Sequence, residues 1–429
     1  MLQLRLEEIG VTFMSHFLIS LIQNSPTPWH ACRAAAVAFD LCGFQMLSET
    51  VPWKLRTGKK YVVTRNGSSL IAFAMPKKTP TSAHIAAAHL DSPALKLKPN
   101  GVEEKEGLAL FHLEVYGAPI LASWVGRDLF FAGRLFYREK NGHVANTLIA
   151  LPELVVQIPH LAIHLDRQVN DTGLILQKEE HLIALGPSLG EKGFQKLLEK
   201  KLPKEAELLY SELYAVPNES PDRIGMSSRW ASSYRLDNMS CSGAILEAFI
   251  EQEASDDILK MAVFWNHEEI GSQTQEGAGS SFFSDILQRI TASTKQDYYC
   301  LKAASRTLSC DVAHAFNPNH QAKYDTLHRL HMGKGIAIKV NADQRYVTDP
   351  ALVSQLLLIC QKAKIPYQFF SSRNDIRSGS TVGPIHAALL GIPTVDIGIP
   401  LLGMHAAREV IDLGDYSQLI HLLKHFFVK

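Results

Sequence analysis

Residues 261–272, MAVFWNHEEIGS, decide the fold that we expect for this chain. Residues 261–265 form an apolar run with the length of a buried β-strand, and Gly271 allows a turn after it. Glu268 and Glu269 follow the strand closely, and adjacent carboxylates at a buried strand end are costly unless something pairs with them. A metal ion would serve, because one carboxylate can ligate it while its neighbour transfers protons. A solvated turn with two acids is the plainer interpretation of this stretch alone.

The composition is that of an ordinary soluble globular protein. The chain has 429 residues, 46% hydrophobic and 20% charged, enough for two domains or one large α/β domain with an insertion. Lys and Arg equal Asp and Glu at 43 each, so the charge indicates neither nucleic acid nor an anionic membrane as a partner. No apolar run reaches the ~18 residues of a membrane span. Six scattered cysteines without a C-x-x-C spacing favour reduced thiols and a cytoplasmic protein.

The N-terminal 24 residues predict an amphipathic helix, since Glu7 and Glu8 interrupt the apolar residues and no signal-peptide cleavage site follows. Met14 is an alternative start. Prolines at 26 and 28 then separate two predicted helices, residues 14–23 and 30–41.

Strand and helix signals alternate in the first and last parts of the chain. Asn66-Gly67 predicts a hairpin turn, and residues 84–88 predict a strand that leads into His89 and Asp91. Strands are then expected at 258–265, 307–310, 367–371 and 394–397, and helices at 240–253, 285–291, 350–362, 385–390 and 416–428. Asp415 would cap the last helix. This order predicts an α/β fold with a mixed, largely parallel sheet sandwiched by helices.

The middle of the chain has a different pattern. Strand signals at 108–116, 128–136 and 148–156 follow one another without regular helices, a charged helix is expected at 192–201, and residues 217–228 predict a loop. We therefore expect a split α/β domain, residues 1–95 and 232–429, with an inserted β-rich domain at residues 96–231.

Candidate metal ligands lie just after the predicted strands or in the loops between them. They are His89, Asp91, Asp237, Glu268, Glu269, Asp311 and His405. Ligands of such sheets gather beyond the carboxyl ends of the strands. Carboxylates and imidazoles without thiolates suit divalent metals such as Zn²⁺, and two histidines with three carboxylates suit two metals bridged by a carboxylate and a water. Each residue also has a simpler interpretation; Asp237 could cap a helix and Asp311 could be a loop acid.

Seven motifs, in order, resemble those of one family of metallo-aminopeptidases, the aspartyl aminopeptidases of family M18. They are HLDSP (89–93), RLDN (235–238), NHEEIGS (266–272), SCDVAHAFNPN (309–319), KGIAIKVNADQRYVT (334–348), RND with SGSTVGPI (373–385) and MHAARE (404–409). The resemblance also covers the insertion, through residues 115–135 and 158–165. It therefore spans nearly the whole chain.

The resemblance implies a role for each candidate. His89, Asp237 and Asp311 would hold one Zn²⁺, and Asp237, Glu269 and His405 the other, so that Asp237 bridges two zinc ions per subunit. Glu268 would be the general base that takes a proton from the bridging water and returns it to the leaving amine. Asp91 would orient His89. The substrates would be peptides with free N-termini.

The resemblance also implies a preference for N-terminal Asp or Glu, with His314, Lys339 and Tyr346 lining the substrate site. An acidic side chain needs a cationic pocket, and Lys339 lies in the apolar run 336–340, where it is either a buried ammonium or a surface lysine. In this family the insertion dimerises and carries a histidine, here His160, into the neighbouring subunit's site. Homo-oligomers, dimers and dodecamers, are therefore expected.

Two departures from the family pattern leave the specificity open. The chain has Lys323-Tyr324-Asp325 where the family often has Lys-His-Glu, and Arg377-Ser378 where Pro-Cys is common. One alternative is a di-zinc aminopeptidase with a neutral or broad N-terminal preference. The other is a non-catalytic, metal-organised assembly protein, which need not retain Glu268 beside an intact ligand set.

Overall fold

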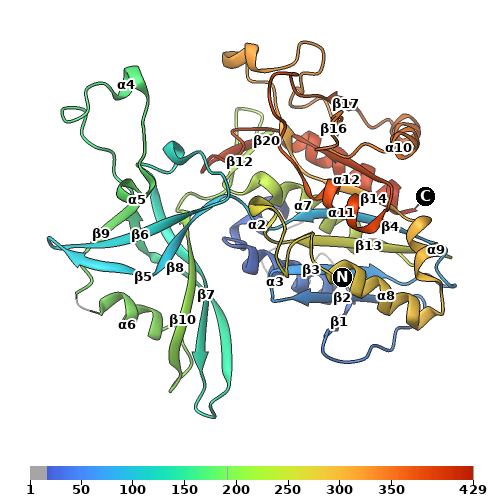
Figure 1. Ribbon diagram of the computed structural model, residues 1–429, viewed down its shortest axis with the longest axis horizontal. Helices are drawn as coiled ribbons and strands as arrows, with labels where there is room; N and C mark the ends of the chain where they lie inside the picture. The colour runs from blue at the N-terminus through green and yellow to red at the C-terminus, as the bar shows by residue number, and fades with distance from the viewer. Residues whose placement is uncertain (1–16, 191, 429) are drawn as a thin grey trace.

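The computed structural model describes residues 17–190 and 192–428. The first 16 residues of the expected N-terminal helix, with the alternative start at Met14, lie outside this range. Figure 1 shows two parts side by side, a large helix-covered sheet and a smaller set of strands drawn in cyan to green.

The larger part is built on a nine-stranded sheet. Its order is β1 (Gln45–Leu47), β2 (Lys60–Arg65), β3 (Ser69–Ala74), β13 (Ile258–Trp265), β4 (Ser82–His89), β14 (Arg306–Cys310), β18 (Thr394–Gly398), β16 (Ile336–Lys339) and β17 (Tyr367–Phe370). The central strands β13, β4, β14 and β18 are parallel. Strand β3 is antiparallel to β2 and β13, and β16 is antiparallel to β18. The predicted mixed sheet is confirmed.

Helices cover both faces of this sheet, as predicted. One face packs against α2 (Phe17–Gln23), α3 (Pro28–Leu41), α7 (Leu236–Ile250), α10 (Pro350–Ala363) and α12 (Leu413–Val428), and the other against α8 (Phe282–Thr294), α9 (Tyr298–Ala303) and α11 (Val382–Leu390). Strand β13 supplies both cores, with Phe264 on the first face and Val263 and Trp265 on the second. Each such side chain contributes about 1.5–3 kcal/mol on full burial. This explains why the run is apolar without alternation.

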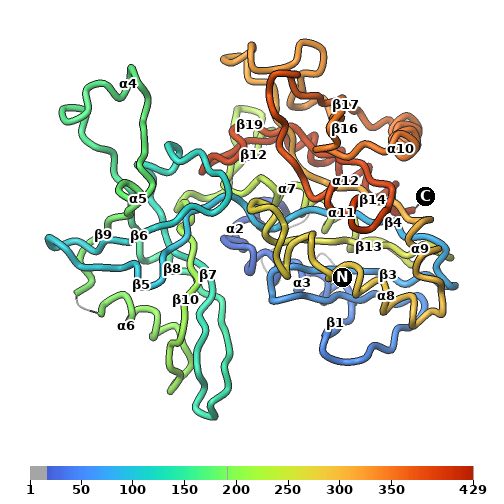
Figure 2. Tube along the Cα trace, in the orientation of Figure 1, coloured from blue at the N-terminus to red at the C-terminus, as the bar shows by residue number. Residues whose placement is uncertain are grey.

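The smaller part is a closed antiparallel barrel. Its strands are β5 (Ala94–Lys105), β6 (Leu108–Tyr116), β7 (Asp128–Arg138), β8 (Val144–Gln157), β9 (Ile183–Pro187) and β10 (Glu207–Pro217). Short helices join or flank them: η1 (Leu121–Ser123), α4 (Val169–Thr172), α5 (Lys178–His181) and α6 (Gly193–Glu199). Figure 2 traces the chain into the barrel at β5 and out of it at β10. The barrel has its own apolar core, and closure leaves no open strand edge.

A third, five-stranded sheet was not predicted. It joins β11 (Asp222–Ile224), β12 (Trp230–Ser233), β20 (Glu409–Asp412), β19 (Pro400–Leu402) and β15 (Ala313–His314). The prediction of a loop over residues 217–228 was therefore wrong at β11. These strands are too short to show a periodic pattern, and the β12–β20 and β15–β19 pairs join segments distant in the sequence, so local patterns carry little signal for them. The pairing of β12 with β20 brings the start of α7 close to the loop that carries His405.

Two helix starts differ from the prediction. Helix α7 begins at Leu236, but Asp237 and Asn238 within it are not helical. Helix α12 begins at Leu413, so Asp415 lies inside its first turn rather than at its cap. The buried Asp415 carboxylate instead accepts the N–H groups of Gly333 and Gly335, at 2.6 and 2.7 Å. None of the described helices is long and apolar enough to cross a membrane.

Candidate metal centre

The parallel strands bring three of the predicted segments to one edge of the large sheet. Trp265, the last residue of β13, is in register with His89, the last residue of β4. Asp91 follows β4, and Asp311 follows β14 on its other side. Glu268 and Glu269 form the short turn η2 (Glu268–Ile270) just beyond β13. The carboxyl ends of three neighbouring strands thus supply most of the candidate ligands.

Asp237 and His405 reach the same edge from irregular backbone. Asp237 has φ −82° and ψ 104° at the kinked start of α7. His405 lies in the loop between β19 and β20 and has a left-handed backbone, with φ 66°. Because neither residue lies in a regular helix or strand, its position depends on the tertiary contacts around it.

Asp237 lies between two histidines. Its Oδ1 atom is 3.5 Å from His89 Nε2, and its Oδ2 atom is 3.3 Å from His405 Nε2. On the first side, His89 Nε2 is also 3.6 Å from Asp311 Oδ1. On the second side, His405 Nε2 is 3.5 Å from Glu269 Oε2. The two ligand groups therefore share Asp237 and no other residue.

The donor set fits divalent cations. Two ligand atoms on one tetrahedral zinc, each at about 2.0–2.2 Å from the metal, lie about 3.3–3.6 Å apart. The separations above fall at these values. Asp237 Oδ1 is buried and has no hydrogen-bond partner among the residues that the structure describes. A buried, unpaired carboxylate oxygen is costly in a protein interior, and a cation would satisfy it. Ligand atoms of His89, Asp237 and Glu269 lie within 4.8 Å of one another.

The charges of the site point the same way. We call Asp237, Glu268, Glu269 and Asp311 the carboxylate cluster. Burial, with repulsion from Asp237 and Glu268, raises the pKa of Glu269 well above its usual value. Two divalent cations would balance the charge of a fully ionised cluster and relieve this repulsion.

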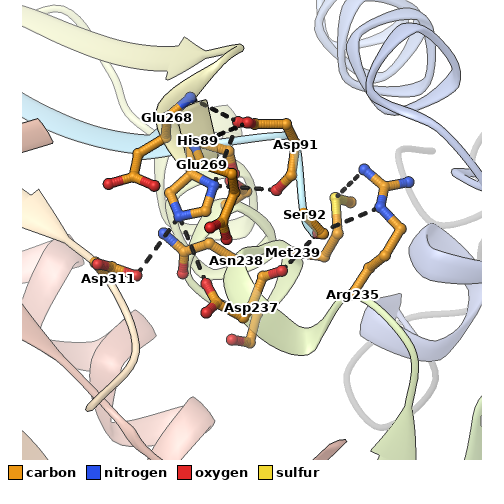
Figure 3. Close-up of polar contacts among 12 residues, drawn as sticks. His89, Asp91, Ser92, Arg235, Asp237, Asn238, Met239, Glu268, Glu269 and Asp311 are labelled. Atoms are coloured by element: carbon orange, nitrogen blue, oxygen red, sulfur yellow. Dashed lines mark hydrogen bonds and ion pairs between the residues drawn. The ribbon is translucent and has the colours of Figure 1, made fainter. Parts of the chain in front are cut away.

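Asp91 holds the turn that carries the two glutamates (Figure 3). Its carboxylate is fully buried and accepts the N–H groups of Glu268 and Glu269, at 3.2 and 3.1 Å. It also accepts the Tyr116 hydroxyl at 2.7 Å. His89 Nδ1 lies 3.0 Å from the backbone carbonyl of Asp91 and 3.5 Å from its carboxylate. The carbonyl is thus the closer partner of the His89 ring, and the carboxylate chiefly orders the glutamate turn.

Glu268 differs from its neighbours in having a free carboxylate. The side chain points away from Asp91 (Figure 3), and no hydrogen bond or ion pair of its carboxylate occurs within residues 17–190 and 192–428. Burial, together with repulsion from Asp311 and Asp91, raises the pKa of Glu268 to about 8. A carboxyl group of raised pKa that is not held by other groups is suited to accept and return a proton.

Lys339 and Tyr346 lie directly beside the cluster. Lys339 is 1% exposed, and its Nζ atom is 3.4 Å from Asp311 Oδ2 and 5.1 Å from the centre of the Tyr346 ring. The interpretation of Lys339 as a surface lysine is therefore wrong. His314 packs edge-to-face on Phe370, with ring centres 5.9 Å apart. A cavity of about 230 Å³ extends from His314 along Tyr324 and Arg377.

His160 lies elsewhere. It is exposed in the barrel part of the chain and packs beside Gly126, where an added Cβ would come within 2.8 Å of the His160 ring. No described contact joins it to the carboxylate cluster within one subunit.

Sequence reasoning missed Glu409 and Tyr116. Glu409 is 2% exposed and accepts the N–H groups of Asp237 and His405, at 2.9 and 2.8 Å. Its sequence signals are its place at the end of the MHAARE motif and its spacing of four residues from His405, and neither indicates what it holds. Tyr116 ends a barrel strand, so its hydroxyl on Asp91 could not be anticipated from local pattern.

Known proteins resemble this chain over nearly its whole length. A family model described as "Aminopeptidase I zinc metalloprotease (M18)" matches residues 21–427. A "Probable M18 family aminopeptidase 2" of Pseudomonas savastanoi is 36% identical over 423 residues, covering 96% of this chain and 98% of the relative. A protein of the same description from Borreliella burgdorferi is 35% identical over 424 residues, with 97% and 98% coverage.

Solved structures have the same fold. A chain in the cryo-EM structure of the Ape4 and Nbr1 complex matches with a TM-score of 0.91 at 33% identity, covering 96% of this chain and 84% of that chain. A chain of the S. cerevisiae mApe1 dodecamer matches with a TM-score of 0.85 at 26% identity, with 96% and 95% coverage. The similarity therefore includes both the large sheet and the barrel.

Proposed function

The chain belongs to the M18 family of zinc metallo-aminopeptidases, which are peptide-bond hydrolases, and we propose that it is a di-zinc enzyme that removes N-terminal Asp or Glu from peptides. The observation that carries the two-metal proposal is Asp237, whose two oxygens face His89 on one side and His405 on the other. His89, Asp237 and Asp311 would hold one zinc. Asp237, Glu269 and His405 would hold the other.

Zinc bound in these two places would polarise the scissile carbonyl and acidify the attacking water. Glu268 would take the proton of that water on its free carboxylate and pass it to the leaving amine. The Asp91 carboxylate would keep Glu268 in place by holding its backbone N–H. Because Asp91 also holds Glu269, the base and the ligand would keep a fixed relative position.

The charges around the substrate cavity support a preference for acidic N-terminal residues. The cavity beside His314 is lined by Lys323, Arg373 and Arg377, against a single carboxylate, that of Asp325. Lys339 adds a buried ammonium at the cluster. A carboxylate side chain of the substrate would therefore find donors and positive charge on this side of the metal ligands.

A neutral or broader preference is the second candidate. The Lys339 ammonium already pairs with Asp311, and Arg373 pairs with Asp375 at 2.6 Å, so part of the positive charge is used within the protein. The observation that favours a neutral or broader preference is therefore the ion pair between Lys339 and Asp311. Competition between Asp311 and the substrate for Lys339 would decide between the two candidates.

A panel of chromogenic aminoacyl substrates tests the specificity. We expect purified, zinc-loaded enzyme to cleave Asp and Glu derivatives with the highest kcat/KM, and to lose activity on dialysis against a chelator. Equal or faster turnover of Leu or Ala derivatives would reject the acidic preference and leave the aminopeptidase assignment standing.

We also propose that the chain assembles into homo-dimers and, through them, a dodecamer in the cytoplasm. Apolar side chains in the barrel part support an assembly surface, since Leu165 and Ile175 are 74% and 75% exposed. The mApe1 structure, which is a dodecamer, shares both parts of the fold. All six cysteines are free thiols, as expected in a reducing compartment. Mass measurement in solution tests the assembly.

A further inference from the structure

Glu409 is a buried carboxylate that the mechanism above does not use. It is the first residue of β20 and is 2% exposed. A carboxylate in such a place must be held by hydrogen bonds or by a cation.

Each oxygen of Glu409 holds the backbone of one metal-ligand candidate. Oε1 accepts the N–H of His405 at 2.8 Å, and Oε2 accepts the N–H of Asp237 at 2.9 Å. The two amides come from different segments, the loop before β20 and the start of α7. One planar carboxylate thus fixes the distance between two backbone positions that no continuous element connects.

The backbones of Asp237 and His405 both depend on tertiary hydrogen bonds of this kind. His405 has a left-handed backbone, and Asp237 interrupts the helical geometry of α7. Neither backbone conformation is set by a regular hydrogen-bond ladder. The side chains of the same two residues meet at 3.3 Å, from Asp237 Oδ2 to His405 Nε2. A small shift of either backbone would change that separation directly.

Asp91 does the same for the other pair of residues. It accepts the N–H groups of Glu268 and Glu269, as Glu409 accepts those of Asp237 and His405. Two buried carboxylates, Asp91 and Glu409, therefore each accept hydrogen bonds from the backbone amides of two residues of the centre.

We propose that Glu409 is a positioning residue that sets the spacing of Asp237 and His405, and through it the affinity of the site formed by Asp237, Glu269 and His405 for its zinc. The proposal rests on the two-zinc centre proposed above. Glu409 contacts the ligands only through their backbones, so it acts on the cation without touching substrate.

The test uses Glu409→Gln, which changes one atom. An amide offers a single acceptor oxygen, so one of the two N–H groups would face an NH2 group instead. We expect the zinc affinity of the site formed by Asp237, Glu269 and His405 to fall about 10- to 100-fold, and the affinity of the other site, which shares only Asp237 with it, to fall less. Competition with a zinc-binding dye, on the full-length assembled protein, measures both dissociation constants. Saturating zinc should restore kcat with KM unchanged.

Asp415→Asn is the matched control. The Asp415 carboxylate is also buried and also bridges two backbone amides, those of Gly333 and Gly335, and it makes no contact with the ligand residues in the described structure. Its variant should lose thermal stability and keep both zinc constants. Glu409→Asp, which keeps the charge but is shorter, should most weaken the same site as Glu409→Gln.

Three results would overturn the proposal. Wild-type zinc constants in Glu409→Gln would show that the spacing does not depend on this carboxylate. Loss of folding in both Glu409 variants, with Asp415→Asn folded, would assign Glu409 to the fold alone. A wild-type protein that holds fewer than two zinc ions would refute the two-metal proposal itself, and this one with it.

Discussion

Glu268 and Glu269 are adjacent in the sequence but differ in what surrounds their carboxylates. Glu269 Oε2 lies 3.5 Å from His405 Nε2, inside one ligand group. The Glu268 carboxylate has no partner among the described residues, and its raised pKa reflects burial among other acids. In the proposed mechanism, the same turn would therefore separate a ligand from a proton carrier, because both of its backbone amides donate to Asp91 while the Glu268 carboxylate points away from it.

Glu268→Gln tests this separation. The amide keeps the size of the side chain and cannot accept a proton, so we expect kcat to fall roughly 10²–10⁴-fold. Zinc content should stay at the wild-type value, because Glu268 is outside both ligand groups. Elemental analysis and steady-state kinetics on the same preparation measure the two quantities. Near-normal turnover would contradict the role of Glu268 as the base.

Lys339→Met tests the source of the proposed acidic preference. Methionine fills a similar volume without charge, so the substrate carboxylate would lose its buried cation. We expect the ratio of kcat/KM for Asp over Ala substrates to fall about 10- to 100-fold, the value of one charged hydrogen bond. Because Lys339 also pairs with Asp311, both proteins are compared at saturating zinc. An unchanged ratio would show that Lys339 does not determine the specificity, and Arg377→Gln would then be the next variant to measure.

At the scale of helices and strands, α7 links the metal centre to the packing of the molecule. Its first residues carry Asp237, and its later turns pack against α12. Glu247 on α7 accepts a hydrogen bond from Tyr416 on α12 within this contact. Burial raises the pKa of Glu247 from 4.5 to about 7. The helix contact therefore contains a titrating group that is separate from the candidate metal ligands.

Glu247 should make stability depend on pH. Below pH 4.5 folded and unfolded chains both carry its proton, and between pH 4.5 and about 7 only the folded chain keeps it. Its stabilising contribution is thus present at low pH and lost as the pH rises through 7, by about 3 kcal/mol at most. Glu247→Gln should therefore gain thermal stability over wild type at pH 8.5 and less at pH 5.5.

The sequence predicted those elements whose signal is local. Residues 261–265 of strand β13 form an unbroken apolar run because both faces of the strand are buried, so the position of the strand followed from composition. Strand β11 has three residues and is stabilised by pairing with β12, which leaves no periodic pattern to detect. The kink at Asp237 and the contacts of Glu409 depend on segments that meet only in the folded chain. The ligand types and Asp91 could be anticipated from sequence, and Glu409, which holds the backbones of Asp237 and His405, could not.

At the scale of the whole molecule, the barrel and the large sheet contribute to one site. Tyr116 ends the barrel strand β6, and its hydroxyl reaches Asp91 in the other part. The carbonyl of Ala118, in the segment after β6, lies 3.0 Å from His405 Nδ1. The insertion thus orients two residues of the metal centre within its own subunit. A residue from the barrel of a neighbouring subunit would act in addition to these contacts within the subunit.

His160 tests whether a neighbouring barrel takes part. It is exposed beside Leu161, which is 62% exposed, and it does not reach the cluster of its own chain in the described structure. If it acts in the next subunit, His160→Ala should lower kcat without loss of zinc.

Co-assembly of His160→Ala with Glu268→Gln should then restore activity, because one subunit keeps Glu268 and receives His160 from its partner. Random pairing in dimers gives about a quarter of wild-type turnover. As a control, the double variant His160→Ala with Glu268→Gln, co-assembled with Glu268→Gln, should stay inactive. If mixed complexes of verified mass regain no activity, His160 does not act in the site of the neighbouring subunit.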